Sequence, residues 1–297
     1  MGYLKKLKYV VFNALAFVPD TLMLKFQFGV KLHRKLNLKD PKRFSDKLQW
    51  YKIYCHDPKM LQCTDKYIVR SFVEERGCGQ YLNTLFQVCD SADKIDFDSL
   101  PDRFVIKTTD GGNGDNIVIC SDKSKLNLST TVRRVNSWRN KHYERLSREW
   151  AYNGAKQSKV IVEKYIEDPQ SADGSIDDYK FLCYDGKFRF LWIDKNRYSN
   201  HNRGFWNEKL EFFFVVSSDH STFDEPPVLP SNIEEMIAVA EKLSAGFPFA
   251  RVDLYNIGGQ IIFGEITFYP WSGYVRFTPD SFDFELGKYF KLPEIQK

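Results

Sequence analysis

The chain has 297 residues and a mass of 34.9 kDa, with 43% hydrophobic and 28% charged side chains, which is enough to bury a substantial core in two or more lobes. Its net charge of +4 suits phosphate-bearing or uronic ligands and falls well short of a nucleic-acid-binding signature, so we expect no nucleic-acid partner. The six cysteines form no C-x-x-C pair and have no zinc-site spacing, which indicates reduced thiols and a cytoplasmic protein.

The N-terminal region combines lysines with apolar residues. An apolar run over 9–18 is shorter than the roughly 20 residues that cross a bilayer, and Pro19 and Asp20 follow it where a secretory signal would have small residues. We expect an amphipathic helix that packs on the body of the protein; a basic helix lying on the inner face of the membrane is the alternative. Residues 21–60 continue at helical spacing and are broken at Pro41, which predicts a helical lead-in.

The next segment, 64–77, predicts a helix. It opens with Thr64 or Asp65 as an N-cap and ends at Gly77. Lys66 would then lie in the first helical turn.

A second helix is expected over 231–247, where Ser231 caps the helix, Glu234 completes a capping box and Gly246 ends it. Runs of β-branched and aromatic residues predict short strands. These strands are 103–107, 116–120, 159–168 and a pair joined by a Tyr-Asp-Gly turn within 177–197. The fold class is therefore α+β, with mostly antiparallel strands and helices packed on them.

A glycine-rich loop follows the first of these strands. It places Lys107 before Gly111, Gly112 and Gly114; backbone N–H groups in such a loop can surround phosphate oxygens while the lysine adds charge. A hairpin turn is the competing interpretation, because the same residues favour turns. The chain lacks the P-loop spacing and a helix-opening G-x-G-x-x-G, which disfavours the common nucleotide-binding folds.

Residues 251–267, RVDLYNIGGQIIFGEIT, place charges within the two apolar arms of a predicted hairpin. A three-residue loop over 257–259 would put Arg251 opposite Glu265, with the even-numbered apolar residues on the other face. Asp253 would lie diagonal to Glu265 at about 7–8 Å, close enough for the two carboxylates to share Mg²⁺. A solvated cross-strand salt bridge is the alternative.

Further charges occur within or after predicted strands. Lys180 lies inside an apolar strand, which an edge position would explain, and Asp178 shares its face. Glu163, Asp194 and Arg197 each lie at or after the end of a strand. Each alone is more often a solvated strand end than a site; together they indicate one cleft.

In chain order, the motifs TDKY, FVIK, the glycine loop, VEKYI, DYKF, ARVDLY and FGEITFYP resemble the TupA-like branch of the ATP-grasp superfamily, which is associated with bacterial polysaccharide biosynthesis. The resemblance covers about residues 20–290. It implies an ATP-grasp fold, in which two α+β lobes with mostly antiparallel sheets clasp ATP. The implied division is a helical N-terminal region 1–62, an N-terminal ATP-grasp part 63–166 with the glycine-rich loop, and a C-terminal lobe 167–297 with the metal and substrate site.

By matching position, the resemblance also implies roles for residues, with ATP and Mg²⁺ as cofactors. The phosphates would be held by Lys66, Lys107, Lys180, Gly111, Gly112 and Gly114. Adenine and ribose would be bound by Glu163, Lys164, Tyr165, Ile166 and Asp178. The metal would be held by Asp253 and Glu265, and the catalytic and acceptor positions would be Arg251, Lys180, Asp194 and Arg197. Thr267 replaces an asparagine common in the superfamily; its hydroxyl can ligate a metal but reaches less far, which leaves a second metal site open.

The implied activity is ATP-dependent ligation of a carboxylate and an amine through an acyl phosphate, for example of an amino acid to a uronic acid. The partners would be a saccharide or small-molecule carboxylate and an amine, with peripheral contact to membrane-bound polysaccharide machinery. One alternative is a glycosyltransferase, which would need a D-x-D metal motif that no strand end carries. The others are a sugar kinase and a non-catalytic carbohydrate-binding protein, in which Trp192, Trp206 and Trp271 would stack on sugars.

Overall fold

The N-terminal lead-in is helical, as expected. The computed structural model describes residues 15, 17–110, 116–139, 147–152, 158–171 and 173–295, so most of the apolar run 9–18 lies outside the described residues. The lead-in helices are α2 (Asp20–Leu32), α3 (Phe44–Tyr54) and α4 (Pro58–Thr64), followed by α5 (Val69–Glu75). Within the described ranges no helix is both long and apolar enough to cross a membrane.

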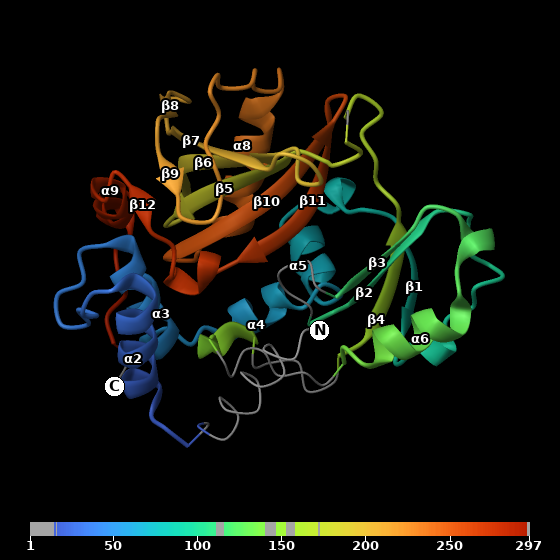
Figure 1. Ribbon diagram of the computed structural model, residues 1–297, viewed down its shortest axis with the longest axis horizontal. Coiled ribbons are helices and arrows are strands. Elements are labelled where there is room, and N and C mark those ends of the chain that lie inside the picture. Colours follow the sequence, from blue (N-terminus) through green and yellow to red (C-terminus); the bar gives the residue numbers. More distant parts are fainter. Residues whose placement is uncertain are drawn as a thin grey trace.

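A four-stranded antiparallel sheet forms the smaller lobe (Figure 1). Across the sheet its strands are β1 (Leu85–Cys89), β4 (Val160–Lys164), β2 (Phe104–Thr108) and β3 (Ile117–Cys120). Helix α6 (Leu128–Asn136) packs on β2 and β3 and encloses a separate core with them. These strands confirm the predictions for 103–107 and 116–120, whereas the strand predicted over 159–168 ends already at Lys164. The loop residues 111–115 lie outside the described part.

A six-stranded antiparallel sheet forms the larger lobe (Figure 1). Across the sheet its strands are β11 (Gln260–Thr267), β10 (Phe249–Ile257), β5 (Asp178–Tyr184), β6 (Lys187–Lys195), β7 (Asn202–Asn207) and β8 (Phe212–Phe213). Helix α8 (Ile233–Ser244) packs on β10, β5 and β6. The remaining elements are β9 (Val216–Ser217), β12 (Phe277–Thr278), α9 (Ser281–Tyr289) and the 3₁₀ turns η1 (Gly79–Tyr81), η2 (Ala92–Lys94), η3 (Lys123–Lys125), η4 (Trp150–Tyr152) and η5 (Pro270–Gly273).

The helix predicted over 64–77 is shorter than expected. Asp65 Oδ1 accepts hydrogen bonds from the backbone N–H groups of residues 67 and 68, at 2.8 and 2.9 Å, and so holds a turn ahead of the helix. Helix α5 begins only at Val69, and Lys66 lies in the preceding turn rather than in the helix. The end was predicted correctly, since Gly77 takes a φ of +66°, which glycine adopts without a Cβ clash.

Helix α8 begins one residue later than predicted. Asn232, not Ser231, is at the N-cap, and its side-chain amide donates to the Gly259 carbonyl at 2.9 Å instead of capping the helix. The expected capping box with Glu234 therefore does not form. This hydrogen bond ties the start of α8 to the β10–β11 turn, and Gly246, with a φ of +87°, follows the end of the helix as predicted.

The predicted three-residue loop of the β10–β11 hairpin is wrong. A bulge compensates for the shorter turn, so that the charged residues of the two strands still share one face of the sheet. The turn has two residues, Gly258 and Gly259, with φ of +58° and +91°. Relative to the predicted loop, such a turn alone would shift the pairing of the two strands by one residue. A bulge between Asp253 and Leu254 offsets this shift, and Gly264 is the extra residue of the bulge. Asp253 therefore lies directly opposite Glu265, closer than the predicted diagonal.

Two details of that strand pair follow from the bulge. Arg251 pairs with Thr267 rather than with Glu265. A side chain at Gly264 would bring its Cβ within 2.9 Å of the Asp253 carbonyl oxygen, so the bulge requires glycine. Beyond the bulge the alternation is shifted, so that Ile261 is buried in the core while Ile262, expected on the apolar face, is only partly buried.

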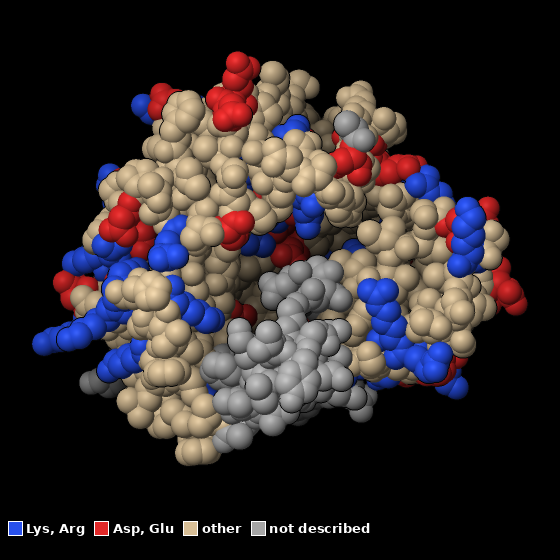
Figure 2. Space-filling model, viewed as in Figure 1, with Lys and Arg blue, Asp and Glu red and all other residues tan. Residues whose placement is uncertain are grey.

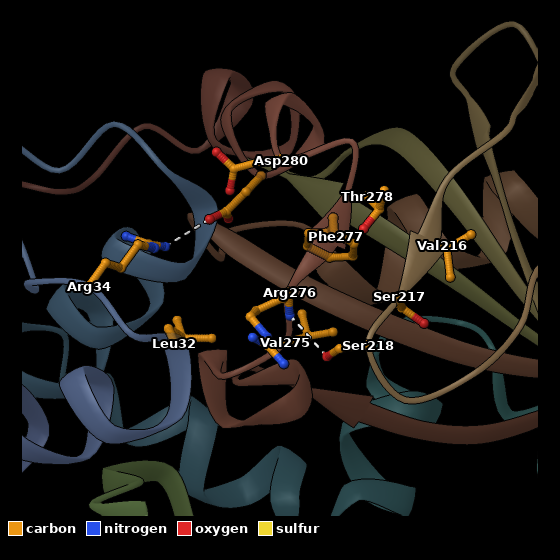
Figure 3. A pocket seen from close by; sticks show the side chains of 11 residues that line it. Leu32, Arg34, Val216, Ser217, Ser218, Val275, Arg276, Phe277, Thr278 and Asp280 are labelled. Carbon is orange, nitrogen blue, oxygen red and sulfur yellow. Dashed lines mark hydrogen bonds and ion pairs between the residues drawn. The ribbon is translucent and has the colours of Figure 1, made fainter.

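The lead-in helices share the core of the larger lobe. Phe44 and Tyr51 of α3 make edge contacts with Phe249 and Phe290, with ring centroids 5.1 and 5.2 Å apart. A hollow of about 290 Å³ lies along this junction, between the end of α2 and the segments of β9, β12 and α9 (Figure 3). Arg34 at its wall donates to Asp283 of α9 at 2.9 Å. The hollow therefore lies at the contact between α2 and the body of the protein.

We expect Gly287→Ala to lower the free energy of unfolding by about 1–3 kcal/mol, because a Cβ at this position of α9 would lie 2.7 Å from the Phe44 backbone nitrogen. Gly29→Ala is the matched control within α2. Among the described residues, no atom outside its own helix backbone lies within 4 Å of its Cβ position, so we expect a gain of up to about 1 kcal/mol from helix propensity. Urea unfolding measures both, and equal effects would contradict the close approach of α9 to the lead-in.

Candidate functional site

Charged residues form two adjacent rows across the open face of the six-stranded sheet. In the first row, Glu265 pairs with Asp253, which pairs with Lys180. In the second, Asp178 pairs with Asp194, which pairs with Arg203. Directly paired residues of neighbouring strands have side chains on the same face about 5 Å apart, so the register itself brings these groups together. β5 lies between β10 and β6, so the alternative that an edge position explains Lys180 does not hold.

Lys180 and Arg251 join the carboxylates of the first row. The Lys180 ammonium donates to Asp178 at 2.5 Å and to Asp253 at 2.7 Å. Arg251 binds both oxygens of Asp253, each at 2.7 Å, and reaches Glu265 at 3.1 Å. The side chain of Asp253 is 2% exposed, whereas that of Glu265 is 45% exposed and opens to the cleft. The solvated salt bridge considered for this hairpin therefore does not describe Asp253.

The charges of this cluster shift one another's protonation. Burial disfavours the charged form of Lys180 and of Arg251, but the neighbouring carboxylates outweigh it and raise the pKa of both. Burial also raises the pKa of Asp253, against the opposing effect of Arg251 and Lys180. For Glu265, the cations Arg251, Lys66 and Lys180 outweigh burial and hold the pKa at about 2. Glu265 thus presents an ionised carboxylate to the cleft at neutral pH.

Lys107 and the residues around α5 form the opposite wall of the site. Lys107 of β2 donates to Glu163 of β4 at 2.8 Å, and Arg70 of α5 lies 3.6 Å from the same carboxylate. The backbone N–H of Lys66 donates to the carbonyl of Thr109 at 3.0 Å, which places Lys66 beside the end of β2, while α5 itself packs in the core of the larger lobe. Burial lowers the pKa of Lys66, an effect that the Glu265 carboxylate opposes. Cations on this wall therefore face the carboxylates of the six-stranded sheet.

Between these walls lies a cleft of about 420 Å³, visible as a hollow with acidic and basic side chains on its wall (Figure 2). The predicted site residues that line it are Lys66, Lys107, Glu163, Ile166, Asp178, Lys180, Asp194, Arg197, Arg251, Asp253 and Glu265. Lys164 and Tyr165 are not among its lining residues; Arg103 lies over the Tyr165 ring at 4.5 Å. Thr267 lies behind the lining, where its hydroxyl donates to Glu265 at 3.1 Å. Gly111, Gly112 and Gly114 lie outside the described residues.

Most residues at the outer end of the cleft were not predicted from the sequence. Arg203 donates to Asp194 at 2.7 Å and to Asp219 at 2.6 Å. The rings of His201 and His220 lie beside this pair, with centroids 3.6 Å apart. Arg203 sits in an aromatic strand, NRGFW, as Lys180 does in DYKF, and that signal could have found it. Asp219 and His220 lie in a loop whose sequence has no periodicity.

A stacked pair of tryptophans lies between Arg251 and Arg203 of the cleft. Trp192 of β6 stacks on Trp271 of η5, with centroids 4.0 Å apart and an interplanar angle of 11°. Arg251 lies over the Trp192 ring at 4.7 Å and Arg203 at 4.5 Å. Of the three tryptophans expected at the cleft mouth, Trp192 and Trp271 line the cleft and Trp206 does not. Trp192 is itself only 2% exposed and, like Trp206, belongs to the larger core.

A family model described as TupA-like ATPgrasp matches residues 46–291. The chain belongs to the TupA-like ATP-grasp family. The expected α+β ATP-grasp fold is thereby confirmed.

Solved structures similar to this TupA-like protein include D-alanine--D-alanine ligase from Bacillus anthracis, with 20% identity over 69% of this chain and 57% of that chain and a TM-score of 0.43. L-amino acid ligase from Bacillus licheniformis has 19% identity over 71% of this chain and 44% of that chain, with a TM-score of 0.42. The ADP complex of PurK, N5-carboxyaminoimidazole ribonucleotide synthetase, has 13% identity over 75% and 50%, with a TM-score of 0.43. The chain thus spans about half of each of these proteins. No curated protein matches it.

The donor set of the TupA-like site fits a hard divalent cation that keeps other ligands. Asp253 and Glu265 offer paired carboxylates, and one Asp178 oxygen is buried with no hydrogen-bond partner among the described residues. Those residues contain no cluster of three or more His, Cys, Asp or Glu side chains arranged as a protein-only metal site. Mg²⁺ is usually held by one or two carboxylates together with water and phosphate oxygens, so two suffice.

We expect Lys180→Met to lower the free energy of unfolding by about 3–5 kcal/mol, because it leaves the buried carboxylates of Asp178 and Asp253 without their shared cation. The control is Lys195→Met on β6, which breaks a more exposed pair with Asp177 and should cost less than about 1 kcal/mol. Urea unfolding of both variants is the measurement. Similar losses in the two would contradict the structural role of Lys180.

Proposed function

We propose that this protein is an ATP-dependent carboxylate–amine ligase that forms an amide in capsule or surface polysaccharide assembly. The observation that carries the proposal is the cross-strand pair Asp253 and Glu265, held beside Arg251 and Lys180 in a cleft that Lys66 and Lys107 also line. Carboxylates that can hold a metal, surrounded by cations that can oppose phosphate charge, suit phosphoryl transfer.

The nucleotide would bind in the cleft between the sheets. Lys66 and Lys107 supply positive charge for the phosphates from the opposite wall of the cleft, and the Lys107–Glu163 hydrogen bond orients Lys107. The backbone after β4, ending at Ile166 on the cleft wall, would recognise adenine. Asp178, with one buried oxygen lacking a partner among the described residues, would accept a hydrogen bond from a ribose hydroxyl. The glycine-rich loop over 111–114 would close over the phosphates.

Asp253 and Glu265 would hold Mg²⁺, with the Thr267 hydroxyl supporting Glu265. The bound metal would supply charge to oppose the phosphate oxygens during transfer. Arg251, held against Asp253 by two hydrogen bonds, adds a fixed positive charge at the same place. Its pKa is raised by Asp253 and Glu265 despite burial, so this charge persists at every working pH.

The reaction would proceed in two steps. A substrate carboxylate oxygen forms a bond to the terminal phosphorus of ATP while the bond from that phosphorus to ADP breaks. The amine nitrogen then attacks the acyl carbon of the mixed anhydride, the carbon–oxygen bond to phosphate breaks, and the nitrogen loses a proton. The products are an amide, ADP and phosphate. Arg251 and Lys180 would stabilise negative charge on the transferring group in both steps.

The acceptor would occupy the outer end of the cleft. Trp271, which is partly exposed at the cleft and is supported from behind by the buried Trp192, is suited to contact a sugar ring. Arg197, whose guanidinium lies 3.3 Å from Asp178, is placed to meet a carboxylate. The Asp194–Arg203 pair and the two histidines offer hydrogen bonds to hydroxyl or amino groups. This combination supports a uronic acid as the carboxylate substrate.

Glu265→Gln should lower the rate of amide formation by about 100-fold or more while leaving the fold intact, because Glu265 is half-exposed and its charge serves the metal. Asp177→Asn, a carboxylate of the same lobe outside the cleft, is the control and should retain activity. The assay measures ADP release over pairs of uronic acids and amino acids, with mass spectrometry for a product one water lighter than its parts.

The same assay distinguishes the alternatives. ADP release that needs both the carboxylate and the amine supports the ligase. ADP release without an amine indicates a kinase, and consumption of a sugar nucleotide without ATP indicates a glycosyltransferase. Calorimetry that finds no binding of Mg-ATP would contradict the proposal and favour a carbohydrate-binding protein.

A further inference from the structure

Helix α2 has two unlike sides. One side packs on the body, and its buried residues are Met23, Leu24, Gln27, Phe28 and Leu32. The other carries Leu22, Phe26 and Val30, which are 58%, 65% and 58% exposed. Residues four apart lie on one side of a helix, so these three form a continuous apolar stripe, to which we give the name α2 stripe.

The α2 stripe has no role in the core or in the cleft. None of its three residues belongs to either core cluster or lines the cleft between the lobes. Phe17, just before the helix, is 82% exposed as well. Single exposed apolar residues are common, but a row of them on one helix marks a contact surface.

The surroundings of the stripe are basic. Lys25 is exposed at its edge, and Lys35 and Lys39 are exposed just beyond the helix. Residues 17–39 contain five Lys and Arg and a single acidic residue, Asp20, which pairs with Arg148. The other 274 residues contain 38 basic and 38 acidic residues, so the positive excess of the chain lies in this segment. Figure 2 shows basic side chains gathered at the end of the molecule that carries the lead-in helices.

We propose that the α2 stripe docks this protein onto a membrane surface that contains anionic lipids. Leu22, Phe26 and Val30 would enter the boundary between headgroups and acyl chains, and the lysines around them would contact the headgroups. Charge decides between this occupant and a second copy of the chain, because two copies meeting at this face would bring their positive excesses together. An anionic lipid surface is complementary to both the apolar and the basic part.

Docking through α2 is independent of the chemistry proposed for the cleft. The helix is held to the body by its buried side and by the Arg34–Asp283 hydrogen bond, so docking needs no rearrangement of the site. A protein anchored in this way would act on a substrate held at the membrane surface.

The test is co-sedimentation of the full chain with vesicles of phosphatidylcholine alone or with 30% phosphatidylglycerol. We expect binding to the anionic vesicles about tenfold or more above binding to the neutral ones, and a decrease as salt is raised. The triple variant Leu22→Ser/Phe26→Ser/Val30→Ser and the single variant Lys25→Glu should each weaken binding, the triple by about tenfold or more.

Matched controls lie on other surfaces. Val228→Ser removes an apolar side chain that is 95% exposed, and Lys209→Glu reverses an exposed charge; both should bind as the unaltered chain does. Thermal unfolding establishes that the variants are folded, and the salt dependence of the unaltered chain tests the proposal without any substitution. The proposal is overturned by absence of binding to anionic vesicles, by equal binding of the triple variant, or by a dimer in solution that the triple variant abolishes.

Discussion

The site depends on two buried carboxylates, Asp178 and Asp253, that a single lysine holds together. Lys180 lies within hydrogen-bond distance of both, and Arg251 binds Asp253 from the other side. Removing such charges from water is costly, and only close pairing offsets the cost. The sheet must therefore keep a register in which β5, β10 and β11 present these residues to the same face.

That requirement gives the β10–β11 hairpin its unusual construction. Its two-glycine turn would by itself direct Asp253 and Glu265 to opposite faces, and the bulge at Gly264 restores the match. The close approach of Gly264 to the Asp253 carbonyl explains why no side chain is present there. Turn and bulge thus act together, and either one alone would separate the two carboxylates.

Much of this could be predicted from the sequence, because charges in strands of strong β propensity are rare enough to be informative. The helical lead-in, both sheets' main strands and the convergence of Lys180, Arg251, Asp253 and Glu265 follow from periodicity and from motif order. The hairpin register could not be predicted, because a three-residue loop and a two-residue turn with a bulge give the same facing. Asp219 and His220 could not be found either, since only the tertiary fold brings their loop to Arg203.

The two walls of the cleft carry different charged groups. The larger sheet carries the paired carboxylates, and the smaller lobe contributes Lys107 of β2. Lys66 precedes α5, which packs in the core of the larger lobe. Two separately packed lobes can change their separation without disturbing either core, which suits the enclosure and release of a nucleotide. The stacked Trp192 and Trp271 lie between Arg251 and Arg203, so in the proposed ligation both substrates would meet beside Arg251.

The most direct test is a crystal structure of the protein with a non-hydrolysable ATP analogue and Mn²⁺ in place of Mg²⁺. The account predicts an anomalous peak about 2.1 Å from carboxylate oxygens of both Asp253 and Glu265, with the triphosphate between β10 and β2. A metal remote from these two carboxylates, or a nucleotide bound outside the cleft, would contradict it.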